Sequence, residues 1–277
     1  MTVRSTHQPV SSVADLTELV RAGALGPDPA SCAVSVAFTT SQGARHASRD
    51  RSYRNTVVSL RIERAVGSCA VEPGELADAD VHDCVGASAA DLLAHPSPAI
   101  RTAALDAYLM SAHPHERSGA RPVVVAGGTS LEKSLARASA VVDLLDAPPG
   151  SRVLVVGVVN SLLHHLRARG LRYVPCDLKG GRTEWDEPVV TDALAAVEHC
   201  DLVLVSGMAV GNGSFEPLLR TASLAGRPVV AFAQTASAVL PWFLGAGLSA
   251  VSAEPYPFFW LDGGPTTVFQ YRREHTS

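Results

Sequence analysis

The segment from Gly150 to Leu178, GSRVLVVGVVNSLLHHLRARGLRYVPCDL, constrains the fold of this chain more than any other. Its first part, SRVLVVGVV, is apolar and β-branched, as expected of a parallel strand that is buried on both faces. Asn160 and Ser161 can begin a helix, Gly170 can end it, and a second strand, LRYVPCDL, follows. This order predicts the opening of a doubly wound, Rossmann-like sheet whose ligand lies at the carboxyl ends of the strands.

The alternation of strands and helices continues along the second half of the chain. Helix-like segments LEKSLARASAVVDLL, TDALAAVEHC and FEPLLRTASLAG alternate with strand-like segments DLVLVSG, RPVVAFA and LSAVSA, and an aromatic-rich, irregular tail follows. Short connections between such units are typical of a parallel sheet that is covered on both faces. The segment VVVAGG, at residues 123–128, is consistent with either a short strand or a loop.

The predicted helices and strands follow a different order in the first half of the chain. The segment SSVADLTELVRAG predicts a helix, CAVSVAFTTS and RNTVVSLRIER predict two strands joined by a polar turn at residues 43–50, and SPAIRTAALDAYLMSA predicts a second helix. Because these elements do not alternate as βαβ units, we expect a small α+β domain over residues 1–120 and a Rossmann-like domain over residues 121–277. The predicted fold class is therefore α/β.

Composition narrows the range of partners. The 277 residues carry a formal net charge of -4 and no basic run, which argues against nucleic acid as a partner. The apolar runs are too short to span a membrane and the first residues lack the apolar core of a signal peptide, so we expect a cytoplasmic protein with no membrane partner. The five cysteines have no paired spacing, which argues against a disulfide framework and a structural zinc site. We therefore expect no tightly bound structural zinc and assign no metal ligands.

The first strand-to-helix turn does not suit a dinucleotide. Such a turn needs several glycines so that the pyrophosphate can approach the backbone, but here only Gly157 is present, followed by Val158 and Val159. NAD is therefore not expected, and we predict no cofactor. The spacing from Gly157 to Asp177 fits an acidic residue that binds a ribose diol, or one that caps a strand end. A nucleoside, an S-adenosylmethionine-like molecule or a small amino acid remains compatible with this turn.

Two later turns also carry polar residues. In SGMAVGNGSFEPLL, residues 206–219, Gly207 follows a strand and a helix is predicted to begin near Ser214. Backbone N–H groups at such a helix start suit a carboxylate or phosphate, although a long turn with glycines at positive φ explains the same residues. In AFAQTAS, Gln234 and Thr235 follow an apolar strand and either line the crevice or cap the next helix.

These segments resemble a bacterial family known for a "putative heavy-metal chelation" domain. The resemblance covers roughly half of the chain, from VLVVGVV to the fifth strand, and its most specific part is DLVLVSGMAVGNGSFEPLL. It implies a Rossmann-like C-terminal domain after a first domain similar to the enolase N-terminal domain. The sequence departs from the family pattern at AQTAS, which lacks a Gly-Pro step, and at Asp106, where the family has Asn. Some relatives belong to specialised-metabolite pathways, and the aziridine-forming protein of azinomycin-type assembly is the relative that the resemblance suggests.

Three functions are compatible with these features. The favoured hypothesis is an enzyme of bacterial specialised metabolism that promotes intramolecular displacement or ring closure on an amino-acid-derived substrate, because no dinucleotide turn and no hydrolytic triad is present. The alternatives are a metal-chelate-binding protein, for which Cys176 and Asp177 are the only clustered ligands, and a non-catalytic partner subunit that uses the aromatic segment 256–260. A homodimer or a partner protein remains open. The catalytic candidates are Asp177 and Asp106, and the predicted ligand-binding residues are Gly157, Asn160, Ser161, Gly207, Asn212, Gly213, Ser214, Gln234 and Thr235.

Overall fold

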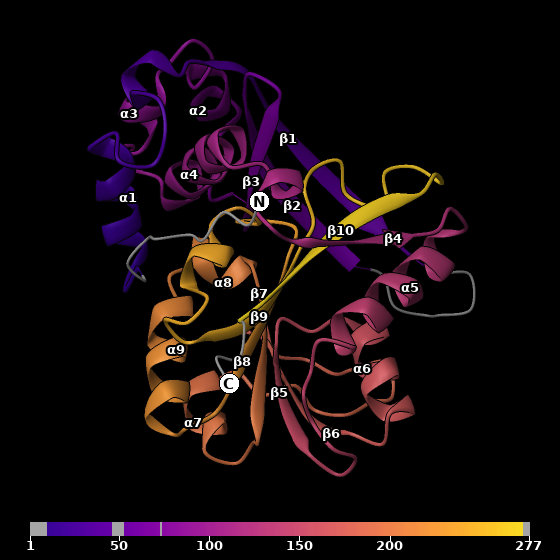
Figure 1. Cartoon of the computed structure of the whole chain (residues 1–277). Coiled ribbons are helices and arrows are strands. Elements are labelled where there is room, and N and C mark those ends of the chain that lie inside the picture. Colours follow the sequence, from indigo (N-terminus) through magenta and orange to yellow (C-terminus); the bar gives the residue numbers. More distant parts are fainter. Residues whose placement is uncertain (1–9, 46–52, 73, 274–277) are drawn as a thin grey trace.

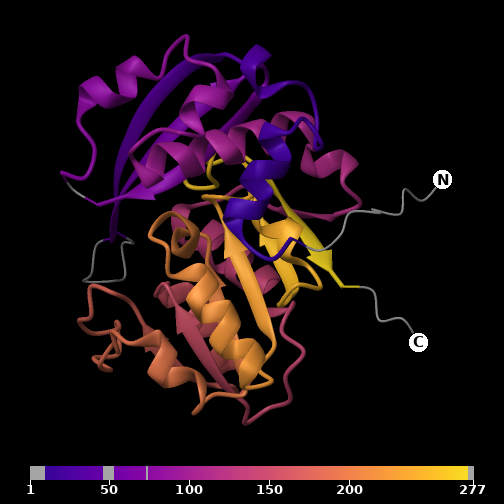
Figure 2. The same cartoon turned by 90° about the vertical axis from the view of Figure 1, so that its left-hand side faces the viewer.

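Two β-sheets, one antiparallel and one mostly parallel, organise the chain (Figures 1 and 2). The computed structural model describes residues 10–45, 53–72 and 74–273. The predicted α/β class is confirmed, because helices and strands alternate along most of the second half and pack as layers. The N-terminal residues that lack a signal-peptide pattern, and most of the predicted turn at 43–50, lie outside the described residues.

The first sheet is an antiparallel meander near the start of the chain. Strands β1 (Val34–Ala44), β2 (Tyr53–Ile62) and β3 (Ala65–Val71) lie in that order. In the register, Thr39 lies opposite Val58, which in turn lies opposite Cys69. The strands β1 and β2 match the two predicted ones, whereas β3 was not predicted.

Helices pack against this sheet. They are α1 (Val13–Arg21), α2 (Asp78–Asp83), α3 (Ala89–Leu92) and α4 (Pro98–Ala112), with the 3-10 turns η1 (Pro29–Ser31) and η2 (His115–Arg117). Helix α4 begins with Pro98, whose missing N–H costs nothing in a first turn. It packs directly on β3 and β2. The contact is so close at Gly67 that an added Cβ would lie 1.9 Å from the backbone nitrogen of Ala107.

The second sheet has seven strands in the order β4-β10-β9-β8-β7-β5-β6. They are β4 (Arg121–Val125), β5 (Arg152–Val156), β6 (Arg172–Cys176), β7 (Leu202–Ser206), β8 (Val229–Ala233), β9 (Leu248–Ala253) and β10 (Thr266–Arg272). The five strands from β5 to β9 are parallel, and their spatial order is second, first, third, fourth, fifth. This is the flavodoxin-like order, which places the topological switch point between β5 and β7.

In this sheet, one open alternative of the sequence analysis is decided and one prediction is wrong. The segment at 121–125, compatible with a strand or a loop, forms the edge strand β4, and the tail predicted as irregular contains β10. Strand β10 runs antiparallel between β4 and β9. Its buried Gln270 accepts a hydrogen bond from Arg121 and donates one to the carbonyl of Ala140. A polar residue in a buried strand hides the apolar pattern from sequence reasoning.

Helices cover both faces of the second sheet (Figure 1). Helices α5 (Ser130–Val142) and α6 (Asn160–Ala168) lie on one face, and α7 (Ala193–Val197), α8 (Met208–Gly211) and α9 (Phe215–Leu224) lie on the other. The 3-10 turn η3 (Leu240–Phe243) follows β8. Helix α5 starts at a capping box, in which the Thr129 hydroxyl accepts from the Glu132 N–H and the Glu132 carboxylate accepts from the Thr129 N–H.

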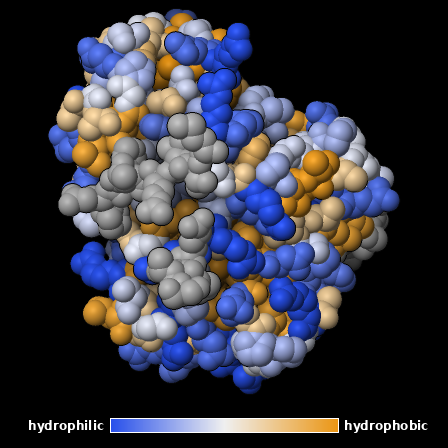
Figure 3. All heavy atoms as spheres, in the orientation of Figure 1, coloured by the Kyte–Doolittle hydropathy of each residue, from blue (hydrophilic) through white to orange (hydrophobic). Residues whose placement is uncertain are grey.

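The largest apolar core joins the two sheets. It contains Leu60 and Ile100 from the first half together with Val203, Phe215 and Phe243 from the second, all fully buried. A smaller core lies between α5, α6 and the other face of the second sheet. Because the sheets share packing, the division of the chain near residue 120 stays a prediction. The face shown in Figure 3 has apolar residues in small groups among polar ones.

Candidate functional site

Two glycines bring the ends of β5, β7 and β8 together at the switch point. Gly157 follows β5 with φ +89°, and an added Cβ would lie 2.6 Å from the Cβ of Ser206. Gly207 follows β7, and an added Cβ would lie 2.1 Å from the carbonyl oxygen of Thr235. Larger side chains at these positions would push the strand ends apart. Gly157 and Gly207 therefore shape the predicted crevice by allowing close packing.

A pocket of about 350 Å³ opens at these strand ends, and we call it the Arg137 pocket. Its walls come from both sheets, from the start of α5 and α6, and from the segment after β9. The lining residues are Gln42, Gly43, Arg45, Asn55, Val57, Ala70, Ser130, Ser134, Arg137, Val159, Ser161, Ser206, Met208, Phe232, Gln234, Thr235, Phe258, Phe259 and Trp260. The described lining thus combines aromatic and apolar surface with amides, hydroxyls and guanidinium groups.

Arg137 is the charged group that the fold holds most firmly in this pocket. Its Nε donates to the Glu254 carboxylate at 2.5 Å, and both side chains are almost fully buried. Its guanidinium carbon lies 5.7 Å and 5.5 Å from the ring centroids of Phe232 and Phe259. Within the described part of the chain, no residue accepts a hydrogen bond from the terminal nitrogens of Arg137. The ion pair therefore fixes the guanidinium and leaves its outer edge for another acceptor.

Two amide groups in the pocket are also unsatisfied. The side-chain nitrogens of Gln42 and Gln234 are buried, and neither has a hydrogen-bond partner. The oxygen of the Gln42 amide accepts from the indole N–H of Trp260, which orients its nitrogen. A buried donor without a partner costs about 1–3 kcal/mol, so both amides favour an acceptor atom within the pocket. Nearby, the hydroxyls of Ser134 and Ser161 lie 2.9 Å apart.

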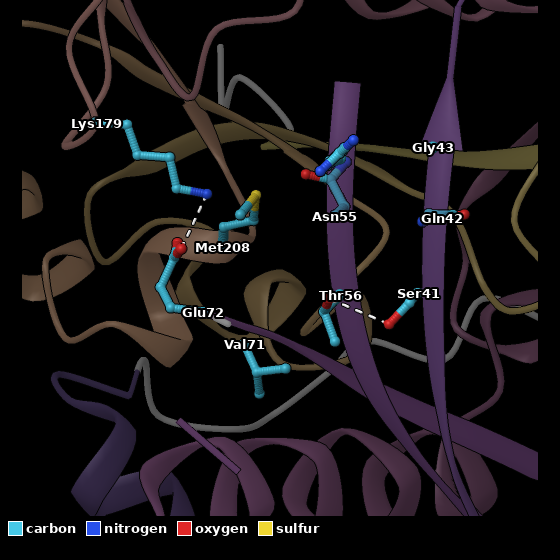
Figure 4. Close-up of a pocket in the computed structure, with 10 residues that line it drawn as sticks. Ser41, Gln42, Gly43, Asn55, Thr56, Val71, Glu72, Lys179 and Met208 are labelled. Carbon is cyan, nitrogen blue, oxygen red and sulfur yellow. Dashed lines mark hydrogen bonds and ion pairs between the residues drawn. The ribbon is translucent and has the colours of Figure 1, made fainter. Parts of the chain in front are cut away.

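A second pocket, of about 430 Å³, adjoins the first, and we call it the Lys179 pocket (Figure 4). It shares Gln42, Gly43, Asn55 and Met208 with the Arg137 pocket. Its further lining residues are Ser41, Arg54, Thr56, Val71, Glu72 and Lys179. Figure 4 shows Lys179 reaching across to Glu72 on one side, with β1 and β2 on the other. The ammonium of Lys179 lies 2.9 Å from the carboxylate of Glu72.

Some of the predicted site residues meet at the Arg137 pocket. Ser161, Gln234 and Thr235 line it directly. Asn160 is buried at the start of α6, where its side-chain oxygen accepts from the Glu184 N–H at 3.4 Å. With the two close-packed glycines, these residues bring the predicted strand ends into one site.

Asp177, Asn212, Gly213 and Ser214 do not line either pocket, and neither do Gly157, Asn160, Gly207 and Asp106. Helix α8 separates Asn212, Gly213 and Ser214 from the end of β7, and the Asn212 side chain accepts from both the N–H and the hydroxyl of Ser214. The expected helix start at Ser214 therefore lies one short helix away from the strand end. The carboxylate of Asp177 accepts from the N–H groups of Lys179 and Val158, and so orders the loops after β6 and β5.

Asp106, the other catalytic candidate, lies between the two sheets and is 1% exposed. Its carboxylate accepts from the N–H of Ser68 in β3 at 2.8 Å and from the N–H of Ala238 at 2.7 Å. Burial raises the pKa of Asp106 to about 7, in spite of these hydrogen bonds and one from the backbone of Val239. The geometry favours a structural role, in which Asp106 ties the first sheet to the turn that carries Gln234 and Thr235.

The raised pKa of the buried Asp106 carboxyl predicts that the free energy of unfolding falls as the pH rises. The folded protein holds a proton on Asp106 up to about pH 7, whereas the unfolded chain loses it near pH 4, so the free energy of unfolding should fall between these values. From pH 5 to pH 8, wild type should lose on the order of 2–3 kcal/mol relative to Asp106→Asn. Urea unfolding of both proteins at several pH values checks this. A difference that does not change with pH would contradict it.

The opposite wall of the pocket consists of residues that were not predicted from the sequence. Gln42 and Asn55 come from the first sheet, Arg137 comes from α5, and Phe258 and Phe259 come from the segment after β9. One signal was present: Lys133 and Arg137 lie four residues apart on the buried face of α5, beside Ser134 and Ala138. The segment 256–260, considered as a partner surface, instead packs inward, with Phe258 1% and Phe259 4% exposed.

Comparisons with known proteins agree with this architecture. Residues 140–253 match the DUF364 family, described as "Putative heavy-metal chelation". A DUF364 protein of unknown function from Desulfitobacterium hafniense has 14% sequence identity and a TM-score of 0.62, over 94% of this chain and 99% of that one. A second, from Pyrococcus horikoshii, has 13% identity and a TM-score of 0.52, over 85% of this chain and 93% of that one.

The match to the DUF364 family model over residues 140–253 agrees with the resemblance seen in the sequence. No curated protein matches the chain. The expected link to an azinomycin-type aziridine-forming protein, and to antibiotic biosynthesis, has no support from these comparisons. Within the described residues, no helix is both long and apolar enough to cross a membrane.

The family description raises the question of a metal. Over residues 10–45, 53–72 and 74–273, no group of three or more His, Cys, Asp or Glu side chains is placed to hold a metal ion. Burial raises the pKa of Cys69 to about 12 and that of Cys176 to about 11, so without a metal both thiols stay protonated at neutral pH. The described residues therefore do not fit a directly bound heavy metal, and we assign no chemistry to one.

Proposed function

We propose that this protein binds a small, carboxylate-bearing, amino-acid-derived molecule in the Arg137 pocket. The observation that carries this proposal is the buried Arg137 guanidinium, which Glu254 holds by Nε and whose terminal nitrogens have no acceptor among the described residues. A guanidinium edge matches the two oxygens of a carboxylate. A fixed guanidinium also loses little conformational entropy when such a group binds.

The other residues that line the Arg137 pocket suit both the oxygen atoms and the apolar side group of such a ligand. The unsatisfied nitrogens of Gln42 and Gln234 can donate to carbonyl or carboxylate oxygens. Phe258, Phe259 and Trp260 supply an aromatic wall for an apolar side group. Pockets of this kind, mostly apolar with a few placed donors, are typical of small-molecule sites.

For the bound molecule we propose intramolecular displacement, with aziridine-type ring closure as one form of it. Among the described lining residues of the Arg137 pocket, hydrogen-bond donors are plentiful and Asp, Glu, His and Cys are absent. Donors stabilise a departing anion, and a folded substrate brings its own amine to the reacting carbon. The neutral amine nitrogen forms a bond to the reacting carbon. The bond from that carbon to the leaving group breaks, the leaving group keeps the electron pair, and the amine loses a proton to solvent. In this proposal, Asp177 and Asp106 position the loops around the site.

Binding is tested with N-acetyl-L-phenylalanine and its primary amide, by isothermal titration calorimetry. We expect the carboxylate to bind about tenfold tighter than the amide, because only the carboxylate can accept two charge-assisted hydrogen bonds from Arg137. Gln234→Met should weaken binding of the carboxylate about fivefold, since it removes one donor.

Asn212→Ala is the matched control, because Asn212 lies outside both pockets, and it should leave the affinity unchanged. Equal affinity for the two probes, or no binding of either, would overturn the binding proposal. Release of chloride from 3-chloro-L-alanine, with formation of aziridine-2-carboxylate, tests the displacement separately. The absence of any acceleration would remove the displacement and leave the binding proposal in place.

A further inference from the structure

The charged side chains around the two adjoining pockets are mostly cationic, although the chain as a whole is not. The formal net charge of the chain is -4. The charged residues that line the pockets are Arg45, Arg54, Arg137 and Lys179, against Glu72. A cleft lined by one sign of charge attracts ligands of the other sign. The single ligand carboxylate placed on Arg137 does not account for Arg54 and Lys179, the cationic residues of the Lys179 pocket.

The Lys179 pocket has the groups needed to hold a second anion. Lys179 comes from the loop after β6 and reaches the exposed carboxylate of Glu72 at the end of β3 (Figure 4). Arg54 makes no ion pair with any residue that the structure describes. Across the pocket, Asn55 and Thr56 on β2 add an amide and a hydroxyl.

The ion pair at the pocket mouth is easily exchanged. The side chains of Lys179 and Glu72 are 58% and 54% exposed, and exposed pairs of this kind contribute about 0–1 kcal/mol. A ligand carboxylate can therefore replace that of Glu72 beside Lys179 at small cost. Four residues line both pockets, so the two pockets adjoin, which is the arrangement that one extended ligand would need.

We propose that the ligand carries a second anionic group, which binds in the Lys179 pocket to Lys179 and Arg54. This inference rests on the proposed function, because it places the first carboxylate on Arg137. It narrows the ligand class to small dianions that combine a carboxylate, an apolar group and a second carboxylate or comparable anion. In this arrangement, Glu72 competes with the ligand for Lys179.

The test compares N-succinyl-L-phenylalanine with N-succinamoyl-L-phenylalanine, in which a carboxamide of the same shape replaces the second carboxylate. Isothermal titration calorimetry at low salt gives the ratio of the two affinities. We expect wild type to favour the dianion about fivefold. Lys179→Gln should bring the ratio close to one, and Glu72→Gln should raise it above the wild-type value. Arg182→Gln, which removes a positive charge from the same loop outside both pockets, should leave the ratio unchanged.

The opposite directions expected for Lys179→Gln and Glu72→Gln separate ligand binding from a structural role. If the ion pair only stabilised the fold, the two variants would alter the affinities in the same direction. Equal affinity of wild type for the two probes, or an unchanged ratio in Lys179→Gln, would overturn the second anion site and leave the proposed function intact. If neither probe binds, the proposed function fails, and this inference fails with it.

Discussion

Replacing Gly67 by alanine should lower the free energy of unfolding by about 4 kcal/mol or more. The new Cβ would lie 1.9 Å from the nitrogen of Ala107 and 2.5 Å from the carbonyl oxygen of Ala103. Both are backbone atoms of α4, so no side-chain rotation relieves the overlap. The helix would have to move away from β3 and would open the core that the two sheets share. Urea unfolding measures the loss, and poor recovery of soluble protein would accompany it.

Gly263→Ala is the matched control for this substitution. An added Cβ there meets nothing closer than the carbonyl oxygen of Gly128, at 3.7 Å, and the backbone is not in the left-handed region. This variant should stay within about 0.5 kcal/mol of wild type. A Gly67→Ala protein as stable as Gly263→Ala would show that α4 and β3 are not in close contact.

The second large effect concerns the buried ion pair. Arg137→Met should cost about 3–5 kcal/mol, because it leaves the Glu254 carboxylate buried without its cation. Combining it with Glu254→Met should recover much of that loss, since two apolar side chains of similar volume replace the pair, although the N–H of Phe259 loses its acceptor. Urea unfolding of the single and double variants tests this expectation.

The double variant also separates folding from binding. It should unfold cooperatively and yet bind N-acetyl-L-phenylalanine no better than the primary amide, because the guanidinium that receives the carboxylate is gone. A double variant as unstable as Arg137→Met would contradict the assigned ion-pair energetics. A double variant that keeps its preference for the carboxylate would show that Arg137 does not recognise the ligand.

Local patterns predicted the parallel part of the fold, whereas long-range pairings escaped prediction. Each unit from β5 to β9 carries its own strand, turn and helix signals within a short stretch, so Gly157, Ser161 and Gln234 could be placed at strand ends. Strand β10 pairs with β4, which lies more than a hundred residues earlier in the chain, and no local pattern encodes that partner. Its buried Gln270 also breaks the apolar run.

The site was predicted in part for the same reason. Ser161, Gln234 and Thr235 follow strands of one sheet, so their proximity follows from the parallel order. Gln42 and Asn55 approach them from a different sheet, and the sequence does not specify how two sheets face one another. Asn212 was placed at a strand end because the four-residue helix α8 is too short to leave a periodic signal.

The walls of the Arg137 pocket come from two different sheets. This affects how the ligand preference can change between related proteins. Arg137, on α5, is fixed by the rings of Phe232 and Phe259 and by its buried ion pair with Glu254, which tolerate little change. The β1–β2 hairpin contributes Gln42 and Asn55 from an antiparallel ladder, in which side chains on the pocket face can be exchanged without breaking the backbone pairing. New selectivity can therefore arise by mutation of the hairpin alone, while the carboxylate anchor is inherited unchanged.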